Sequence, residues 1–307
     1  MKILRRWLSP ITLFVCAALL AVACAGSSGG GDVIRIGSKD FTEQLILGEI
    51  YALVLEDAGY QVERKLNLGG TPVAQAALES GEIDLYPEYT GTGLLTVLKA
   101  EASSDPEAVY ATVSTQYEEQ FNLVWLEPSP MNNTQALAMT TEKSRELGIT
   151  TISDFVAQAS ELTLIGPPEF EVREDGLPGL QAAYGDFQLK GYKAVDAGLR
   201  YQGLVDGEAD VAVAFGTDGE ISAFNLVVLE DDRKLFPPYQ VAPVVRQELL
   251  EANPEVQSIL NELAPVITDE VMQSLNYQVT GEAQEPEAVA QAFLVEYGWL
   301  ENSDGES

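Results

Sequence analysis

The sequence predicts an α/β fold made of two similar lobes. From Val33 onward, strand-like and helix-like stretches alternate, which is typical of parallel α/β sheets. Two distant segments, LESGEIDLYPEYTGTG (78–93) and LVDGEADVAVAFGTDG (204–219), also align without a gap. Each combines a helix end, a glycine turn, a buried strand and an aromatic residue close to a glycine and a threonine. The repeat favours two lobes that each point an aromatic side chain into a shared cleft, although such segments also resemble one another by chance.

The first series of elements reads strand, helix, strand, helix, strand. The first helix has an apolar face at helical spacing and is closed by Gly59. In the second helix, Thr71 is the expected N-cap and Pro72 the first helical residue. Parallel sheets bind ligands beyond the carboxyl ends of their strands, so PEYTGTG after the third strand is a candidate binding segment. The expected strands are residues 33–37, 61–68 and 82–86, and the expected helices are residues 38–60 and 71–81.

A second series follows, and the chain ends in three helices. Pro178 lies in the first turn of one helix of this series. The expected strands, with the turns that follow them, are residues 122–128, 135–140, 162–170, 191–195, 208–219, 225–232 and 236–245. The expected helices are residues 153–159, 175–185, 198–207, 253–266, 268–279 and 285–300.

The N-terminal residues have the pattern of a targeting segment. Basic residues up to Arg6 precede a mostly apolar stretch, and small residues precede Cys24, as in a lipobox. We therefore expect a lipoprotein signal peptide over residues 1–23, with Cys24 as the lipid-modified first residue of the mature chain. An uncleaved membrane anchor is the alternative. Residues 24–32 are rich in glycine and serine and are expected to form a flexible tether.

The composition argues against several classes of function. The chain has 48 acidic and 17 basic side chains, so it lacks the basic surface that nucleic-acid binding requires. It has no histidine, and Cys24 is the sole cysteine after the signal segment. Ser-His and Cys-His nucleophiles are therefore excluded, and the commonest zinc ligands are missing. We expect no enzyme, no metal and no cofactor, although chemistry based on carboxylates alone stays open.

Several motifs, in order along the chain, resemble one family. IGSKDFTEQLILGEIYALVLEDAGY, LGGTPVAQAALESGEIDLYPEYTGT, PPEFEVREDGLPGLQAAYG, LEDDRKLFPPY and SLNYQV resemble the ligand-binding components of osmoprotectant ABC importers. These are the glycine betaine/choline receptors of the ProX and OpuC type, and the resemblance runs from Val33 to Trp299. It implies a type II periplasmic-binding-protein fold with a two-strand hinge. Lobe 1 would contain residues 33–131 and 238–302, and lobe 2 residues 132–237.

In that family, tyrosines form an aromatic box around the quaternary ammonium group of the ligand. By position, Tyr89 in EYTGT and Tyr239 in FPPYQ match box tyrosines. Phe215 and Gln135 stand where box tyrosines usually sit. Phenylalanine keeps the π-face of the ring, whereas the glutamine amide offers only hydrogen bonds.

The resemblance also implies a site for the carboxylate of a betaine. Lys39 in GSK, Thr92 in YTGT and Arg173 in FEVRED match carboxylate-binding positions. Lys39 is expected at a helix start, where the helix dipole favours an anion, and Arg173 can grip a carboxylate with two parallel hydrogen bonds. Asn133 and Asp218 are second-tier candidates for ligand contact.

The residues alone leave simpler roles open at these positions. An aromatic residue at a strand end, such as Tyr89, is more often part of the core. Tyr239 follows two prolines and has the alternative of a rigid hinge residue. Lys39 has the alternative of an ion pair with Glu43, and Arg173 that of a surface ion pair with its acidic neighbours.

The resemblance predicts an extracytoplasmic receptor that delivers its ligand to an ABC permease. The expected ligands are glycine betaine, proline betaine, carnitine or choline, bound between the lobes. A different small zwitterion, such as an amino-acid derivative, is the alternative ligand. An enzyme on the same scaffold and a non-transporting sensor are the alternative classes of function. The expected partners are the solute, the permease and, through the lipid anchor, the membrane, with no nucleic acid.

Overall fold

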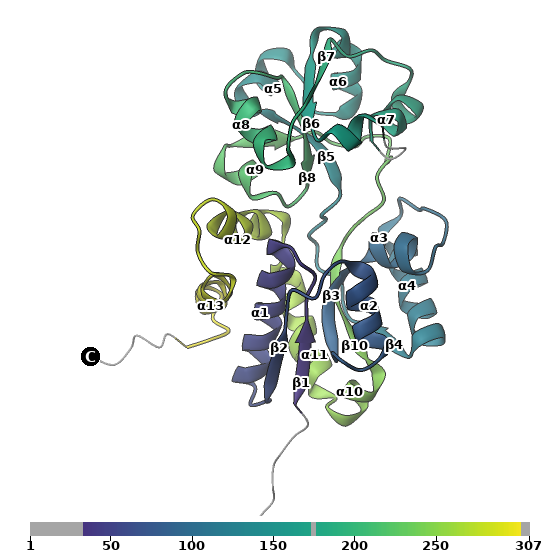
Figure 1. Ribbon diagram of the computed structural model, residues 1–307, viewed down its shortest axis with the longest axis vertical. Helices are drawn as coiled ribbons and strands as arrows, with labels where there is room; N and C mark the ends of the chain where they lie inside the picture. Colours follow the sequence, from purple (N-terminus) through teal and green to yellow (C-terminus); the bar gives the residue numbers. More distant parts are fainter. Residues whose placement is uncertain (1–32, 173–175, 302–307) are drawn as a thin grey trace, which may run out of the picture. The chain divides into compact units, whose positions relative to one another are not determined.

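The computed structural model describes residues 33–172 and 176–301, and the expected signal peptide, Cys24 and the tether lie outside them (Figure 1). The described chain forms two five-stranded sheets, with strand orders β2-β1-β3-β10-β4 and β7-β6-β8-β5-β9. The first sheet consists of β1 (Ile34–Gly37), β2 (Val62–Lys65), β3 (Leu85–Tyr89), β4 (Leu123–Trp125) and β10 (Val241–Arg246). The second consists of β5 (Gln135–Thr140), β6 (Thr163–Gly166), β7 (Gly191–Ala194), β8 (Val211–Phe215) and β9 (Leu226–Val228).

The two sheets share one plan. In the first sheet, β1 is parallel to β2 and β3, and β10 is antiparallel to β3 and β4. In the second, β6 is parallel to β7 and β8, and β5 is antiparallel to β8 and β9. The strands β3 and β8, which carry the repeat seen in the sequence, therefore hold equivalent places. The predicted α/β fold with two similar sheets is confirmed.

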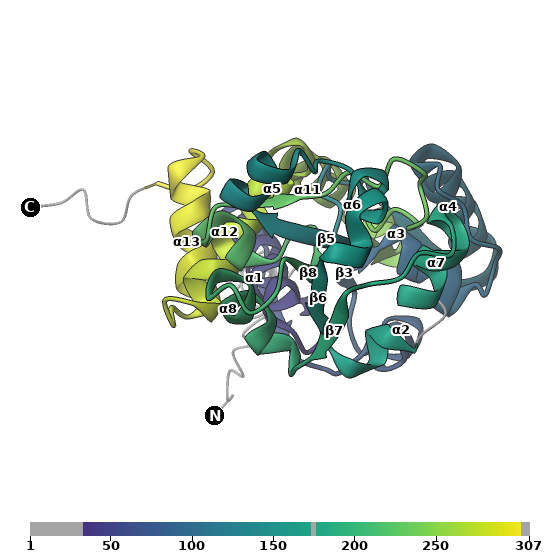
Figure 2. The same cartoon turned by 90° about the horizontal axis from the view of Figure 1, so that it is seen from above.

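Helices flank both sheets, and the C-terminal ones complete the core of the first. Helix α1 packs against α11, α12 and α13, and α12 and α13 lie beside it in both views (Figures 1 and 2). No described helix is both long and apolar enough to cross a membrane. The longer helices are α1 (Thr42–Asp57), α2 (Thr71–Glu79), α4 (Pro106–Phe121), α7 (Leu177–Tyr184), α11 (Glu255–Leu263), α12 (Asp269–Thr280) and α13 (Pro286–Glu296). The shorter ones are α3 (Thr90–Thr92), α5 (Thr141–Leu147), α6 (Ile152–Gln158), α8 (Arg200–Val205), α9 (Gly219–Ala223) and α10 (Gln247–Ala252).

The third strand extends beyond its expected end. The expected strand ends at Tyr86, whereas β3 runs through Pro87 to Tyr89, although proline is disfavoured within strands. Pro87 lies directly opposite Pro243 of β10, and β1 pairs with β3 only at Leu85. Proline is tolerated there because, among the described residues, no strand pairs with Pro87 on the β1 side and needs its missing N–H. The second tyrosine of LYPEY is thus the last strand residue and not part of a loop.

Two helix starts also differ from expectation. Helix α1 begins at Thr42 and not at Ser38, so Lys39 lies in the loop before the helix. The N-cap of α2 is Gly70, and Thr71 is the first helical residue, with Pro72 in the first turn as expected. The Thr71 hydroxyl is therefore not a cap.

Some helices have no counterpart in the sequence prediction. The longest of these is α4, over a stretch for which no element is expected. Its N-cap is Asp105, whose carboxylate accepts hydrogen bonds from the backbone N of Glu107 (3.1 Å) and Ala108 (3.3 Å). Helix α4 ends at Asn122 in the left-handed conformation. The helices α5, α9 and α10 are also additional; each is too short to give a clear periodic pattern.

Two chain segments connect the sheets and pair with each other. They are residues 126–134, between β4 and β5, and residues 229–240, between β9 and β10. Asn132 and Gln240 form an antiparallel bridge. The backbone N of Tyr239 donates to Asn132 Oδ1 at 2.7 Å. The connection between the sheets is therefore a pair of crossing segments held together by hydrogen bonds.

Candidate ligand-binding site

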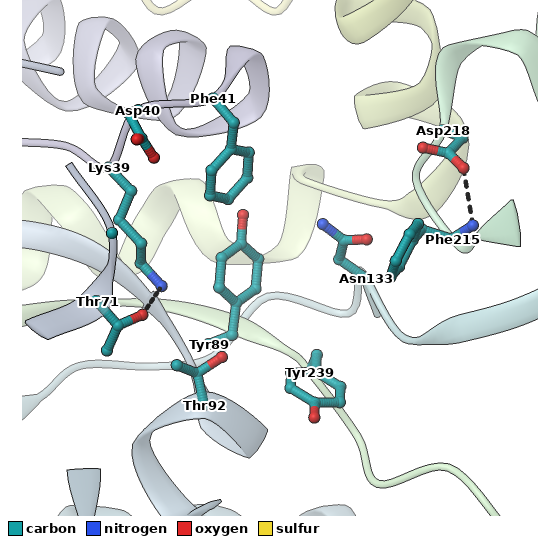
Figure 3. A pocket seen from close by; sticks show the side chains of 11 residues that line it. Lys39, Asp40, Phe41, Thr71, Tyr89, Thr92, Asn133, Phe215, Asp218 and Tyr239 are labelled. Carbon is teal, nitrogen blue, oxygen red and sulfur yellow. Dashed lines mark hydrogen bonds between the residues drawn. The ribbon is translucent and has the colours of Figure 1, made fainter. Parts of the chain in front are cut away.

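A cavity of about 460 Å³ lies at the carboxyl ends of β3 and β8 (Figure 3). Its wall is built from the loop before α1, the start of α2, the end of β3, α3, the end of β8 and both crossing segments. The location agrees with the rule that ligands bind beyond the carboxyl ends of parallel strands. The lining residues are Lys39, Asp40, Phe41, Gly70, Thr71, Tyr89, Thr92, Asn133, Phe215, Asp218 and Tyr239.

Tyr89 forms a fixed part of this wall. It is 4% exposed, and its hydroxyl donates to Glu43 Oε1 at 2.7 Å. The ring of Phe41 stacks near it, with centroids 6.2 Å apart and planes at 20°, and Lys39 Nζ lies 4.9 Å from its centroid. Burial and the nearby Glu43 carboxylate raise the pKa of Tyr89, so its hydroxyl stays protonated and continues to donate. The ring is therefore positioned before any ligand arrives.

Tyr239 is held against a glycine of the EYTGT motif. A Cβ atom at Gly91 would lie 2.9 Å from two ring carbons of Tyr239 and 2.6 Å from the carbonyl oxygen of Pro238. The position requires glycine because any side chain would displace the ring or the backbone. The tight contact explains why a glycine follows Tyr89 so closely in the sequence.

Phe215 ends β8 and is much more exposed than Tyr89, at 41%. The turn after it is held by Asp218, whose Oδ2 accepts from the backbone N of Phe215 at 2.8 Å and from Arg200 Nη2 at 2.6 Å. The hydroxyl of Tyr201 donates to the same oxygen. Asp218 lines the cavity, but its charge is balanced by Arg200.

Lys39 is bound within the protein as well as lining the cavity. Its Nζ lies 2.5 Å from Glu88 Oε1, and the side chains of this pair are 5% and 0% exposed. The same ammonium donates to the hydroxyl of Thr71 at 3.1 Å. The pairing with Glu43 that the residues alone left open is not formed; Glu88 takes that place. Because an ammonium has three donors, these two bonds leave one N–H for a ligand carboxylate.

One described sequence candidate does not line the cavity, and another lies outside the described residues. Gln135 is the first residue of β5, directly opposite Phe215 in the β5–β8 pair, and it does not line the cavity. Arg173 lies outside the described residues. Conversely, the sequence did not single out Phe41, which was assigned to the apolar face of the first helix, or Thr71, which was assigned as a cap. The lining residues not predicted from the sequence are Asp40, Phe41, Gly70 and Thr71.

A buried carboxylate lies behind Tyr89. Glu43 Oε1 accepts from Tyr89 and from Asn133 Nδ2 (2.9 Å), and Oε2 accepts from Asn276 Nδ2 (2.9 Å). Burial raises the pKa of Glu43, while hydrogen bonds from Thr217, Tyr89, Asn276 and Asn133 oppose the rise. Glu43 also lines a smaller cavity of about 230 Å³, which shares Phe41, Asn133 and Asp218 with the larger one.

The chemistry of the site is that of binding. Aromatic side chains from four segments and one lysine converge on a single cavity, as Figure 3 shows. Among the described residues, no cluster of histidine, cysteine, aspartate or glutamate has the arrangement of a metal site. The arrangement suits a ligand with a cationic, methylated end and an anionic end.

Family comparison identifies the class of protein. Residues 32–296 match the OpuAC family, described as the substrate binding domain of ABC-type glycine betaine transport system. The chain belongs to this family. OpuAC proteins are extracytoplasmic substrate-binding components of ABC importers, which agrees with the resemblance read from the sequence.

Individual relatives and a solved structure extend this result. The chain is 38% identical over 297 residues to the glycine-betaine-binding protein of Pseudomonas aeruginosa, covering 92% of this chain and 95% of that protein. It is 36% identical over 264 residues to the ergothioneine transport permease/ergothioneine binding protein EgtU of Helicobacter pylori. That match covers 86% of this chain and 47% of EgtU, so this OpuAC chain spans about half of that relative. The crystal structure of a glycine betaine/carnitine/choline ABC transporter superposes with a TM-score of 0.83 at 30% identity, covering 87% of this chain and 99% of that chain. The fold is therefore that of a type II periplasmic-binding protein.

Proposed function

We propose that this OpuAC protein captures a quaternary-ammonium compatible solute in the cavity at the ends of β3 and β8 and delivers it to an ABC permease. The proposed ligands are glycine betaine, proline betaine, carnitine and choline. The observation that carries the proposal is the convergence of Tyr89, Tyr239 and Phe215 with Lys39 on one cavity.

The residue types suit a trimethylammonium group for a simple reason. Such a group has no N–H and cannot form the directional hydrogen bonds that a carboxylate uses to select an amine. Aromatic faces attract it through their quadrupole, with roughly 0.5–2 kcal/mol per ring depending on desolvation, and also contact its methyl groups. The rings of Tyr89, Tyr239 and Phe215 at one cavity therefore favour a methylated cation over an ordinary ammonium.

The positions of the charges suggest how a betaine lies in the cavity. Lys39 Nζ lies 4.9 Å from the ring centroid of Tyr89, so the lysine repels a ligand cation from the part of the cavity next to its own ammonium. We therefore place the ligand carboxylate near Lys39, with the hydroxyl of Thr92 as a further donor. Arg173 is proposed as a second carboxylate contact from its sequence position. The ammonium group then lies away from Lys39, among the rings of Tyr89, Tyr239 and Phe215.

Closure of two lobes completes the proposal. We assign residues 33–131 and 238–302 to one lobe and residues 132–237 to the other, with the crossing segments as the hinge. Phe215 comes from the second lobe and Tyr89 from the first, so a ligand that touches both rings favours the closed state. Selective binding to the closed state supplies a signal that a permease can read.

A lipid anchor would keep this receptor at the membrane. We propose that Cys24 is acylated after removal of residues 1–23 and that residues 24–32 act as the tether. Cys24→Ser is expected to move the protein from the membrane fraction to the soluble fraction and to abolish labelling by a radioactive fatty acid. Retained labelling or membrane association in that variant contradicts the anchor.

A betaine with a larger side group is the second candidate ligand. The named ligand of the Helicobacter pylori relative, ergothioneine, is an amino-acid betaine with a trimethylammonium group beside a carboxylate. In this chain the smaller cavity next to Asn133 and Asp218 offers space for a side group attached to such a core. The two candidates share the aromatic site and differ in what fills the adjoining space.

A ligand panel tests the proposal directly. Melting-temperature shifts followed by calorimetry are measured with glycine betaine, proline betaine, carnitine, choline and ergothioneine, and with unmethylated glycine and proline as controls. At least one quaternary compound is expected to bind and to be recovered chemically unchanged, while the unmethylated controls bind much more weakly. Failure of every quaternary compound to bind at about 1 mM, a standard-state affinity of roughly −4 kcal/mol, contradicts the proposed function.

A further inference from the structure

The charged side chains around the cavity leave one buried negative charge without a cationic partner. Lys39 is paired with Glu88, and Arg200 with Asp218. Glu43 is 3% exposed, and within the described part of the chain it forms no ion pair with a lysine or arginine. Burial of an unpaired charge is unfavourable, so its retention here calls for a reason.

The partners of Glu43 orient its carboxylate but do not neutralise it. The hydroxyl of Tyr89 and the amide groups of Asn133 and Asn276 donate to its two oxygens, and the side chain of Thr217 is a further donor. All of these groups are neutral, so they replace water around the carboxylate without supplying a positive charge. These bonds fix the carboxylate in one orientation behind Tyr89.

The charge is connected to the cavity by one side chain. The hydroxyl of Tyr89 donates to Glu43 Oε1 at 2.7 Å, and the ring of Tyr89 lines the cavity. A hydrogen bond from a phenol to a carboxylate is charge-assisted and increases the electron density of the ring. A ring with more electron density attracts a cation more strongly.

We propose that Glu43 supplies the counter-charge for the cationic group of the ligand, acting through the hydroxyl and ring of Tyr89 and not by direct contact. The inference rests on the proposed function, because it requires a cationic ligand in the cavity. It makes Glu43 a specificity-determining residue that distinguishes a methylated cation from a neutral group of the same shape.

The same arrangement couples ligand binding to protons. Burial raises the pKa of Glu43 in the empty site, and a bound cation favours its ionised form and lowers that pKa. Ligand affinity is therefore full above the raised pKa of the empty site and falls as the pH falls through it, and binding releases protons in that range. The charged groups that face Glu43 from neighbouring elements are Lys39 and Glu88, around Tyr89, and Arg200, Asp218 and Glu220, around the smaller cavity.

A matched pair of ligands isolates the charge. Glycine betaine and 3,3-dimethylbutanoate have the same shape, but the second has a neutral carbon in place of the ammonium nitrogen. We expect Glu43→Gln to lower the preference for glycine betaine over 3,3-dimethylbutanoate by about tenfold at about pH 7.5, which corresponds to about 1.4 kcal/mol. Tyr89→Phe keeps the ring and removes the hydroxyl that donates to Glu43. It is expected to lower the same preference for glycine betaine by a smaller factor.

The control variant lies on the same helix. Glu49 of α1 is also a buried glutamate, but it is paired with Arg64 at 2.7 Å and does not line either cavity. Glu49→Gln is expected to leave the preference unchanged. If Glu43→Gln weakens both ligands equally, the role of Glu43 is structural and the proposal is overturned.

A second measurement needs no variant and applies even if Glu43→Gln does not fold. Calorimetry of glycine betaine binding to the unaltered chain in buffers of different ionisation enthalpy, over a range of pH, reports the protons released. We expect proton release, together with weaker binding, as the pH falls through the raised pKa of Glu43. The carboxyl of glycine betaine stays ionised there because the adjacent ammonium keeps it acidic. Binding with no proton release and no pH dependence overturns the proposal, whereas failure of all quaternary ligands to bind is the separate result that contradicts the proposed function.

Discussion

The ends of β3 and β8 hold equivalent places in the two sheets, yet they are built very differently. Tyr89, at the end of β3, is 4% exposed and is held by Glu43, Lys39 and Phe41. Phe215, at the end of β8, is 41% exposed, and its backbone N, not its ring, is bound by Asp218. The end of β3 therefore presents a ring that is already buried, and the end of β8 presents a ring with exposed surface that a ligand can cover.

The two strand ends also differ in their neighbouring ion pairs and in the residue two positions after the aromatic ring. Lys39 and Glu88 form a buried pair next to Tyr89, whereas Asp218 in the pair next to Phe215 has a side chain that is 23% exposed. Gly91 accommodates the ring of Tyr239, whereas the aligned position after Phe215 is Thr217. The repeated sequence pattern thus places β3 and β8 equivalently in their sheets, while the ends of the two strands differ in structure and have separate roles in the site.

The largest expected effect comes from the buried ion pair. Lys39→Met leaves Glu88 as an unpaired buried charge and is expected to lower the free energy of unfolding by about 3–5 kcal/mol in urea titrations. Arg200→Met, at the other strand end, is expected to lower it by less, because Asp218 keeps contact with water. Adding Glu88→Gln to Lys39→Met should restore most of the stability but not the affinity for glycine betaine. Equal losses at the two ends, or no restoration by Glu88→Gln, would contradict the described difference.

Truncation of the two aromatic rings is the next largest effect. Tyr89→Ala is expected to lower the free energy of unfolding by about 3–5 kcal/mol, as for other buried aromatic residues, and to weaken glycine betaine binding by at least about tenfold. Phe215→Ala is expected to weaken binding by about threefold to tenfold and to shift the melting temperature by no more than about 2 °C, because the ring is partly exposed. Calorimetry and thermal unfolding of both variants measure the contrast. Similar loss of stability in both would show that Phe215 is as structural as Tyr89.

The fold was more predictable from the sequence than the details of the site. The alternation of strands and helices and the repeat at Tyr89 and Phe215 are local patterns, and both appear in the structure on equivalent strands. The expected strand over residues 135–140 coincides with β5. The end of β3 was misplaced because the tolerance of Pro87 depends on which strands pair beside it, and that is a tertiary property.

Among site residues, those that could be predicted from the sequence have a distinctive chemical type, either aromatic or cationic. Tyr89, Tyr239, Phe215 and Lys39 all line the cavity, although their contact with a ligand stays a prediction. The partner of Lys39 was missed because Glu88 lies 49 residues away in the sequence. The two side chains meet because the fold places β3 next to the loop that precedes α1. Phe41 and Glu43 were missed as site residues for the same reason: their spacing fits a helix face, and only packing shows that they contact Tyr89.

A glycine substitution sharpens the comparison further. Gly91→Ala places a methyl group against Tyr239 and Pro238 and is expected to weaken glycine betaine binding by about tenfold, through displacement of the ring. Gly198→Ala is the control, because no atom lies within 4 Å of a Cβ built there, and it should leave binding unchanged. Binding isotherms with glycine betaine measure the affinities of the two variants. Equal affinity of Gly91→Ala and Gly198→Ala would mean that Tyr239 does not hold the ligand.

The smallest expected effect is that of restoring a hydroxyl at the exposed end. Phe215→Tyr changes a partly exposed position without removing the ring and is expected to alter the free energy of unfolding by less than about 0.5 kcal/mol. Glycine betaine should bind up to about threefold more tightly, since the ring face stays and the hydroxyl adds contact. A change of more than about tenfold in either direction would show that Phe215 is already a fixed part of the wall, like Tyr89.

The central claim is that π-faces select the methyl groups of the ligand and not its charge alone. Calorimetric dissociation constants for glycine betaine, dimethylglycine, sarcosine and glycine test it, because the four differ only in the number of N-methyl groups. The account predicts that affinity falls at each methyl group removed, since each new N–H faces an aromatic ring, which is a poor substitute for the water that solvated it. Equal or tighter binding of glycine would contradict it, because that result requires a carboxylate or another acceptor in direct contact with the ammonium group.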